Sequence, residues 1–318
     1  MDRSGPVAQV RAVVAAFAKT HLRDDERWCV ALSGGADSLA LTGVAARLRP
    51  TTALIVDHGL QAASAVVAER AREQATELGC VGAQILRVDV GTDGGPEAAA
   101  RTARYTALRA ARNGAPVLLA HTLDDQAETV LLGLGRGSGA RSLAGMRAHD
   151  APWCRPLLGV RRATTVAACA ELGVRPWQDP HNSDPRFTRV RLRTEVLPLL
   201  EQVLGGGVAE ALARTAAALR EDTEALDAAA AEIEVPADAL PVADLHGLPT
   251  AVRRRVIRSW LLAGGACDLT DTQIRSVDVL VTAWRGQGGV AVPSGLPRQR
   301  LFAGRRNGAL VLYREPVG

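Results

Sequence analysis

The chain has 318 residues, of which 47% are hydrophobic and 23% are charged, and its net charge is +4. This length exceeds the usual size of one domain and favours two, and the composition excludes a chain that is disordered throughout. No apolar run approaches the ~18 residues of a membrane helix and Met1 to Val10 lack the core of a secretory signal, so we expect a cytoplasmic protein with no membrane partner.

The hydrophobic pattern alternates between segments of strand type and segments of helical spacing. In chain order we expect a helix at Val7–Ala18, a strand at Val30–Leu32, a helix through Leu39, Val44 and Leu48, a strand at Ala53–Val56, a helix at Ser64–Leu78, a strand at Ala83–Val90, a helix at Pro96–Arg112 and a strand at Val117–Ala120. Strands that alternate with helices at this spacing form parallel βαβ units with right-handed crossovers. The predicted fold class is therefore α/β, a Rossmann-like parallel sheet with helices on both faces.

The turn after the first strand has the composition of a phosphate-binding loop. It reads Ser33, Gly34, Gly35, Ala36, Asp37 and Ser38. The N-terminus of the following helix offers unpaired N–H groups and a partial positive charge, and the two glycines can adopt positive φ and let an anion approach. The serines add hydroxyl donors, and Asp37 adds a carboxylate where phosphate and Mg²⁺ would meet. The alternative is a plain helix cap.

The fourth strand runs into a second polar group, His121 to Thr129. Open parallel sheets bind ligands at the carboxyl ends of their strands, so His121 and Asp125 should lie on one edge with the turn and with Asp57-His58. If a helix begins near Thr122, Asp125 and Glu128 share a face and could hold Mg²⁺ and a cationic amine. The alternative is that acidic residues merely favour the first turn of a helix.

Two further patterns are weaker when taken alone. Arg101 and Arg104 lie on one helical face and could reach a phosphate, or they could belong to a solvated face. The stretch 179–184 leads into Arg189, Arg191 and Arg193, which also fits a turn followed by a basic helix.

Basic residues are concentrated between Arg136 and Arg193, where eleven arginines face four acidic residues and give a net charge of +7. Such a band favours a polyanionic partner such as nucleic acid. The chain has a single lysine, Lys19, so arginine-rich codon usage is the alternative explanation. The five cysteines are far apart and form no C-x-x-C pair, which argues against a disulfide framework and against a zinc or iron–sulfur site.

The turn at 33–38 resembles the pyrophosphate loop (PP-loop) of the N-type ATP pyrophosphatases, and the stretch from Cys29 to Leu200 resembles bacterial tRNA(Ile)-lysidine synthetases. The matching blocks, in order, are 33–38, 57–60, 97–105, 121–129, 136–139, 155–158 and 179–198. The chain departs from the usual family residues at Gln61, Val190 and Thr194, positions that concern the tRNA side of the site rather than its chemistry.

The resemblance implies a two-step reaction on an isoleucine tRNA with a CAU anticodon. The C2 oxygen of the wobble cytidine would attack the α-phosphate of ATP and release pyrophosphate, and free lysine would then displace AMP. This order is chemically sound, because a urea-like carbonyl is a poor electrophile until its oxygen becomes a phosphate-type leaving group. The cytidine must be unstacked to reach such a pocket, which suits an anticodon loop.

The resemblance also assigns residues to roles. ATP would be bound by Ser33, Gly34, Gly35, Ala36, Asp37, Ser38, Asp57, His58 and His121. Mg²⁺ would be bound by Asp37 and Asp125, and the amines of lysine would lie near Asp125 and Glu128. Catalysis would rest on Asp37, Asp125, Glu128 and Arg101, the last as a contact to phosphate or to the lysine carboxylate. The tRNA would be held by Arg136, Arg189 and Arg193.

Beyond Gly205 the composition changes. We expect an alanine-rich helix at Ala209–Ile233, a proline-containing linker at Glu234–Pro249, helices at Thr250–Ala263 and Thr270–Trp284, and short strands over Gly288–Tyr313 that carry Arg298, Arg300, Arg305 and Arg306. The expected domains are 1–207 for catalysis, 208–249 as a connector and linker, and 250–318 as a small α+β module. That module could grip tRNA or could be a structural cap.

Other functions share parts of this pattern. A tRNA-thiolating relative would need the cysteine pair that the chain lacks, and a small-molecule ligase such as a GMP synthetase would not need the basic band. A non-catalytic adenine-nucleotide sensor would tolerate loss of Asp125 or Glu128. The sequence leaves the oligomeric state open, a homodimer included.

Overall fold

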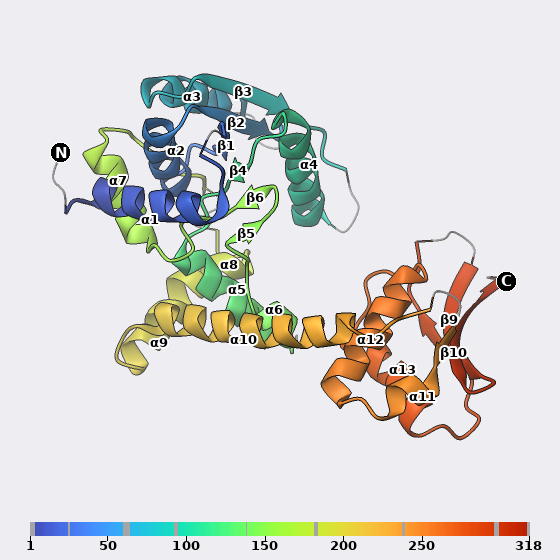
Figure 1. Cartoon of the computed structure of the whole chain (residues 1–318). Coiled ribbons are helices and arrows are strands. Elements are labelled where there is room, and N and C mark those ends of the chain that lie inside the picture. The colour runs from blue at the N-terminus through green and yellow to red at the C-terminus, as the bar shows by residue number, and fades with distance from the viewer. Residues whose placement is uncertain are drawn as a thin grey trace. The chain divides into compact units, whose positions relative to one another are not determined.

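The structure is a computed structural model that describes residues 4–24, 26–59, 64–91, 95–137, 139–180, 184–236, 239–295 and 299–316, apart from the side chains at 96 and 97. The chain divides into two compact units (Figure 1). The first consists of Met1–Ser138 with Ser142–Ala216, and the second of Gly139–Arg141 with Ala217–Gly318. Expectations that concern Leu60, Gln61, Ser138, Arg298 or 181–183 lie outside the described residues and stay predictions.

The first unit contains all the helices and strands that we expected before residue 121. Its elements are α1 (Pro6–His21), β1 (Trp28–Ala31), α2 (Ala36–Leu48), β2 (Thr51–Asp57), α3 (Ser64–Glu77), β3 (Gly82–Arg87), α4 (Pro96–Ala111), β4 (Val117–Leu118), α5 (Leu123–Gly135), α6 (Ala140–Leu143), β5 (His149–Asp150), β6 (Trp153–Cys154), α7 (Arg162–Glu171), α8 (Thr188–Arg191), the π-helix η2 (Leu192–Val196) and α9 (Leu197–Val203). The helix α6 straddles the division between the units, as does α10 (Val208–Ala231).

The strands of the first unit form one six-stranded sheet in the order β3-β2-β1-β4-β6-β5. The four expected strands pair in parallel, with Val30 of β1 opposite Ala53 of β2 and Leu118 of β4. β6 joins β4 in parallel, and β5 is antiparallel to β6. The predicted α/β class is confirmed, and the sheet is mixed at one edge.

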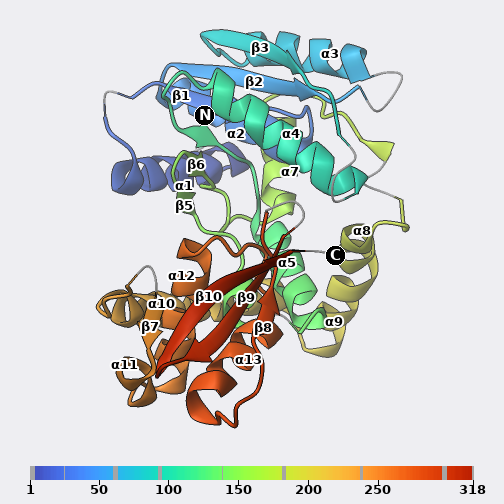
Figure 2. The same cartoon turned by 90° about the vertical axis from the view of Figure 1, so that its right-hand side faces the viewer.

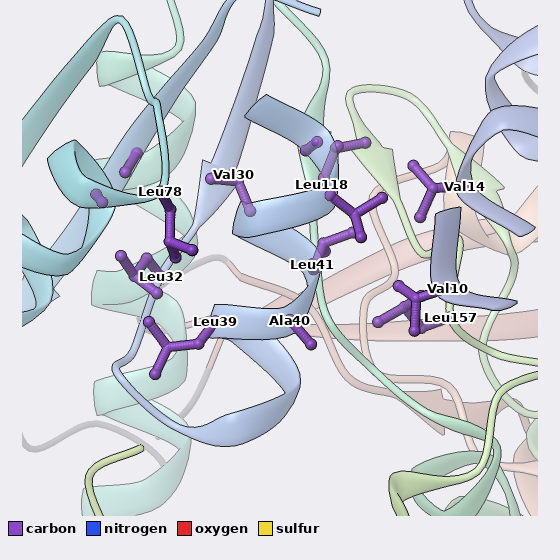
Figure 3. Close-up of a cluster of buried hydrophobic side chains, with 14 of the residues drawn as sticks. Val10, Val14, Val30, Leu32, Leu39, Ala40, Leu41, Leu78, Leu118 and Leu157 are labelled. Atoms are coloured by element: carbon purple, nitrogen blue, oxygen red, sulfur yellow. The ribbon is translucent and has the colours of Figure 1, made fainter. Parts of the chain in front are cut away.

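Helices cover both faces of this sheet, as expected. Because side chains of a strand alternate between its faces, Val30 packs into one cluster with α1, α2, α3 and α7, whereas Cys29 and Ala31 pack into another with α4. Figure 2 shows α4 in front of β1 and β2 and α2 behind them. In Figure 3, Val30 and Leu32 lie near Leu39 and Leu41 of α2. Burial of each such side chain contributes about 1.5–3 kcal/mol.

The second unit is a small α+β module, as predicted. Helices α11 (Val242–His246), α12 (Thr250–Ala263) and α13 (Asp271–Thr282) accompany an antiparallel sheet in the order β7 (Ala239–Pro241), β10 (Ala309–Pro316), β9 (Gln299–Arg306), β8 (Val290–Val292). Trp260, Ile257 and Leu245 lie in its buried core.

The expected linker at Glu234–Pro249 is wrong. β7 and α11 lie within it, and Leu240 and Leu245 are fully buried. Its prolines mark element boundaries instead, because Pro241 ends an edge strand, where its missing N–H is tolerated, and Pro249 precedes α12. The domain boundaries at 207 and 249 stay predictions.

Among the described residues, no single helix is long and apolar enough to span a membrane. Thr188–Val203 and Val208–Ala231 meet that criterion only as a pair, with a bend of 95° between them.

Candidate active site

The carboxyl ends of β1, β2 and β4 meet at two adjoining cavities. The larger, of about 630 Å³, is lined by Ala31, Ser33, Gly35, Ala36, Asp37, Ser38, Arg104, Ala120, His121, Asp125, Arg162, Val166, Pro176, Trp177, Gln178, Asp179 and Arg193. The smaller, of about 260 Å³, is lined by the end of β2 with Asp57 and His58 and by residues from α3. Arg104, Trp177 and Asp179 line both. The three strand-end motifs that the sequence predicted to meet therefore do meet.

The loop at 33–38 is held open by its own hydroxyl groups. The Ser33 N–H donates to Oγ of Ser38 at 3.2 Å, and that hydroxyl donates to the carbonyl of Gly35 at 2.9 Å. Gly34 has φ of +81°, as expected, whereas Gly35 is extended with φ of −74° and does not need positive φ. No side chain caps α2 at Gly35, so the first N–H groups of this helix are available to an anion.

Asp125 is oriented by the start of α5. Thr122 is the N-cap, and the Asp125 carboxylate accepts hydrogen bonds at 2.8 Å from both the N–H and the hydroxyl of Thr122 through Oδ2. The other oxygen, Oδ1, accepts from Nη2 of Arg162 at 2.6 Å. Asp125 therefore stabilises the start of the helix and also faces the cavity. The two sequence interpretations, a residue of the first helical turn and a residue of the site, are compatible.

Arg162 is the residue that sequence reasoning missed. It begins α7, and its guanidinium lies 3.1 Å from Asp37, 2.6 Å from Asp125 and 3.6 Å from Glu128. Thr165, one turn later, donates its hydroxyl to Asp37. The adjacent arginines at 161 and 162 could have indicated this role, because they stand at a helix N-terminus. The helix dipole disfavours cations there unless acidic partners lie close by.

Glu128 is fully buried and is not part of the cavity lining. Its carboxylate accepts hydrogen bonds from Arg193, from Nε at 2.8 Å and from Nη2 at 3.2 Å, and lies 3.7 Å from Arg189. Arg193 belongs to the π-helix η2. Pro198 lies just after this helix and has no N–H to donate to the carbonyl of Thr194, four residues earlier, which is consistent with the widened turn at η2. Glu128 thus holds Arg193, and Arg193 faces the cavity.

The charged groups of the site shift one another's pKa values. Burial raises the pKa of Asp37 despite opposing effects of Arg162 and Thr165. Burial also opposes ionisation of Asp125, but Arg162 and the hydrogen bonds from Thr122 outweigh it and lower the pKa of that carboxyl. Three carboxylates together raise the pKa of Arg162 in spite of its burial. Arg162 and Asp125 therefore favour each other's charged forms, whereas burial disfavours ionisation of Asp37 and shifts its pKa upward.

Two histidines in the described part of the chain carry buried ring nitrogens without a hydrogen-bond partner. These are Nδ1 of His121 in the larger cavity and Nδ1 of His58 in the smaller. Burial lowers the pKa of His121 to about 4, so its ring is neutral at pH 7. A buried polar atom without a partner is costly, and a bound ligand would satisfy each of these.

The two arginines of α4 that share a predicted helical face, Arg101 and Arg104, differ in position. Arg104 lines both cavities, and burial lowers its pKa, whereas Arg101 is exposed and stacks over the ring of Tyr105 at 4.9 Å. Arg104 is therefore better placed than Arg101 to make the phosphate contact that we expected of Arg101.

The donor set fits a magnesium ion. Asp37 and Asp125 both reach one guanidinium, so their carboxylates lie close together beside the phosphate-type loop. Mg²⁺ is usually held by one or two carboxylates together with substrate phosphates and waters. The described residues contain no group of three or more His, Cys, Asp or Glu side chains that could hold a metal ion.

The basic band is largely neutralised by ion pairs. Among the described residues, at least seven of its eleven arginines pair with carboxylates, namely Arg141, Arg161, Arg162, Arg186, Arg189, Arg191 and Arg193. Arg136, at the end of α5, is exposed. The excess charge of the band therefore overstates the positive surface that is free for a polyanion.

Two family models match the chain. A PP-loop domain matches residues 7–200, and a TilS substrate binding domain matches residues 240–310. Among similar curated proteins, the tRNA(Ile)-lysidine synthase of Mycolicibacterium paratuberculosis is 71% identical, and alignment covers 100% of both chains. The protein of the same name from Mycobacterium leprae is 67% identical with the same coverage. That from Rhodococcus erythropolis is 61% identical over 95% of this chain and 93% of its own.

A solved structure with a similar fold is a U34-tRNA thiolase, NcsA, from Methanococcus maripaludis. It aligns with a TM-score of 0.56 and 17% identity over 68% of this chain and 80% of its own. This likeness shows the fold alone.

Proposed function

This chain belongs to the tRNA(Ile)-lysidine synthase family, and we propose that the cavity at the ends of β1 and β4 is its catalytic centre. The protein is an ATP-using ligase that joins lysine to the wobble cytidine of isoleucine tRNA. One observation carries the assignment to this cavity: Ser33 and Asp37, which follow β1, and His121 and Asp125, which follow β4, all line it.

In the first step, ATP lies with its phosphates on the loop at 33–38 and on the N-terminus of α2. Its adenosine occupies the smaller cavity beside Asp57 and His58, which adjoins the loop through Ser33. The C2 oxygen of the cytidine attacks the α-phosphate, and pyrophosphate leaves. Arg104 lines both cavities and can bind the phosphates between them.

Asp37 and Asp125 would hold Mg²⁺, which would neutralise charge on the phosphates during adenylation. The neutral ring of His121 offers a partnerless Nδ1 to a ligand in the same cavity.

In the second step, free lysine displaces AMP from the adenylated cytidine. Asp125 faces the cavity and can bind a lysine amine, and Arg193 is placed to bind the lysine carboxylate or a phosphate. Glu128 acts through Arg193 rather than by contact, because three arginines surround its buried carboxylate. Arg136 and Arg189, both at the surface, are the proposed contacts to a tRNA with a CAU anticodon.

The test is transfer of labelled lysine to a CAU-anticodon isoleucine tRNA transcript by the purified protein. We expect incorporation that requires both ATP and Mg²⁺ and that Asp37→Ala abolishes. The matched control is Asp150→Ala, which removes an exposed carboxylate of β5 outside the cavity and should leave incorporation unchanged. Undiminished incorporation by Asp37→Ala would refute the site. A nucleotide sensor would instead bind ATP without releasing pyrophosphate.

A further inference from the structure

Arg162 occupies the space between the two carboxylates that the proposed metal would use. Its Nε donates to Oδ2 of Asp37 at 3.1 Å, and its Nη2 donates to Oδ1 of Asp125 at 2.6 Å. A guanidinium that spans two carboxylates in this way neutralises both and holds them near each other. The clamp is local to the cavity, which Arg162, Asp37 and Asp125 all line.

The remaining oxygen of each carboxylate already has a partner. Oδ1 of Asp37 accepts from the Thr165 hydroxyl, and Oδ2 of Asp125 accepts from the N–H and hydroxyl of Thr122. Each carboxylate thus directs one oxygen to Arg162 and the other to a threonine. A divalent cation that bound both carboxylates would have to compete with Arg162 for the same two oxygens.

We propose that Arg162 is a built-in cation that holds Asp37 and Asp125 together while no metal is bound, and that it gives way when a divalent cation binds. This inference rests on the proposed metal site at Asp37 and Asp125. The side chain has somewhere to go, because it borders a cavity of about 630 Å³ and is 22% exposed. Once released, its guanidinium faces the region where the phosphates of ATP would lie, and it can bind them at two points.

Charge balance supports an exchange rather than a permanent clamp. Asp37, Asp125 and Glu128 are matched by three arginines, Arg162, Arg193 and Arg189. A divalent ion added to this balanced group would leave excess positive charge unless Arg162 moved to the incoming phosphates. A permanent clamp makes the opposite prediction, since loss of Arg162 would then let the carboxylates separate and would weaken metal binding.

The test measures binding of Mn²⁺ alone to the full-length protein, from the loss of the free-ion signal in electron paramagnetic resonance. We expect Arg162→Met to bind Mn²⁺ more tightly than the wild type by about tenfold, a change worth about 1.4 kcal/mol. The matched control is Arg161→Met, which removes an arginine one position earlier that pairs with Asp124, Glu201 and Glu210 instead. It should stay within about twofold of the wild type, or about 0.4 kcal/mol. Equal or weaker binding by Arg162→Met overturns the proposal.

Two further variants keep the result decisive. If thermal melting shows that Arg162→Met is unfolded, Arg162→Lys decides, because an ammonium cannot span both carboxylates and should still tighten Mn²⁺ binding; equal or weaker binding overturns the proposal. Asp37→Asn tests the metal site itself. If it abolishes binding while the Arg162 variants match the wild type, the exchange is wrong and the site stands. If it binds like the wild type, the metal site is wrong.

Discussion

Arg193 and Glu128 form a two-point ion pair, with Nε 2.8 Å from Oε1 and Nη2 3.2 Å from Oε2. Glu128 has no exposed surface, and Arg162 and Arg189 lie 3.6 Å and 3.7 Å from its carboxylate. This one carboxylate therefore ties α5 to α7, to α8 and to η2. A residue in this position acts by placing the arginines around it.

Replacement of Glu128 by Gln should destabilise the protein and inactivate it. The variant keeps the shape of the side chain but leaves three partly exposed arginines, Arg162, Arg189 and Arg193, without their shared carboxylate. Removal of one partner from a buried ion pair costs about 3–5 kcal/mol, and the partial exposure of these arginines places the cost at the lower end of that range, about 3 kcal/mol. We expect a loss of this order in the free energy of unfolding, measured by urea denaturation, and loss of lysine transfer. Glu195→Gln is the control, because Glu195 pairs with Arg191 on an exposed helix face, where such pairs contribute about 0–1 kcal/mol. Equal stability of the two variants would contradict the role of Glu128.

Thr165 should be needed for its hydroxyl rather than for its shape. It is fully buried and donates a hydrogen bond to Asp37, and a hydrogen bond to a charged group contributes about 1.5–3 kcal/mol. Thr165→Val should therefore lower the rate of lysine transfer by about tenfold or more and move the pKa of Asp37 further above its ordinary value. Thr165→Ser keeps the donor and should retain most of the rate. A valine variant as active as the serine variant would show that the hydroxyl is dispensable.

Local sequence patterns predicted those parts of the site that depend on local structure. A strand followed by S-G-G-A-D-S predicted a phosphate-type loop, and a helix expected to begin near Thr122 placed Asp125 in its first turn. Parallel strands then had to bring these motifs to one edge of the sheet, because their carboxyl ends point the same way. No further information was needed for that step.

The partners of these motifs depend on contacts between distant residues. Arg162 meets Asp37 across 125 positions of the chain, and no local period encodes such a contact. β5 and β6 contain two residues each, too few to carry an alternating pattern. Arg101 and Arg104 share a helical face, so only the packing of α4 distinguishes the exposed arginine from the one that lines the cavities.

The buried cysteines should be inert in the native protein. Burial raises the pKa of Cys29 to about 11, that of Cys154 to about 12 and that of Cys169 to about 11. The thiolate is the reactive form, so alkylation of these three by iodoacetamide should be slow at pH 8 and should barely rise at pH 9. In urea, where thiols recover a pKa of about 8.5, labelling should be fast and should increase over the same range. Rapid native labelling of these sites, detected by mass spectrometry, would contradict the described burial.

Gly34 and Gly35 are adjacent in the loop but should have different roles. We expect Gly34 to contribute to stability and Gly35 to nucleotide binding. Gly34 has φ of +81°, and a Cβ there would lie 3.8 Å from its nearest neighbours, so the cost of Gly34→Ala comes from the backbone alone. A left-handed backbone costs an L-residue about 1–2 kcal/mol, and we expect a loss of this size in the free energy of unfolding.

Gly35 has φ of −74°, which any residue adopts, and a Cβ there would make an ordinary contact with Oγ of Ser33 at 3.6 Å. Gly35→Ala should therefore keep the stability of the wild type within about 1 kcal/mol. Gly35 lines the larger cavity, however, so the added methyl group would stand where a phosphate must approach the backbone. Calorimetric titration with α,β-methylene ATP should show weaker binding by Gly35→Ala than by the wild type. Wild-type affinity in this variant would mean that the phosphates do not lie on the loop.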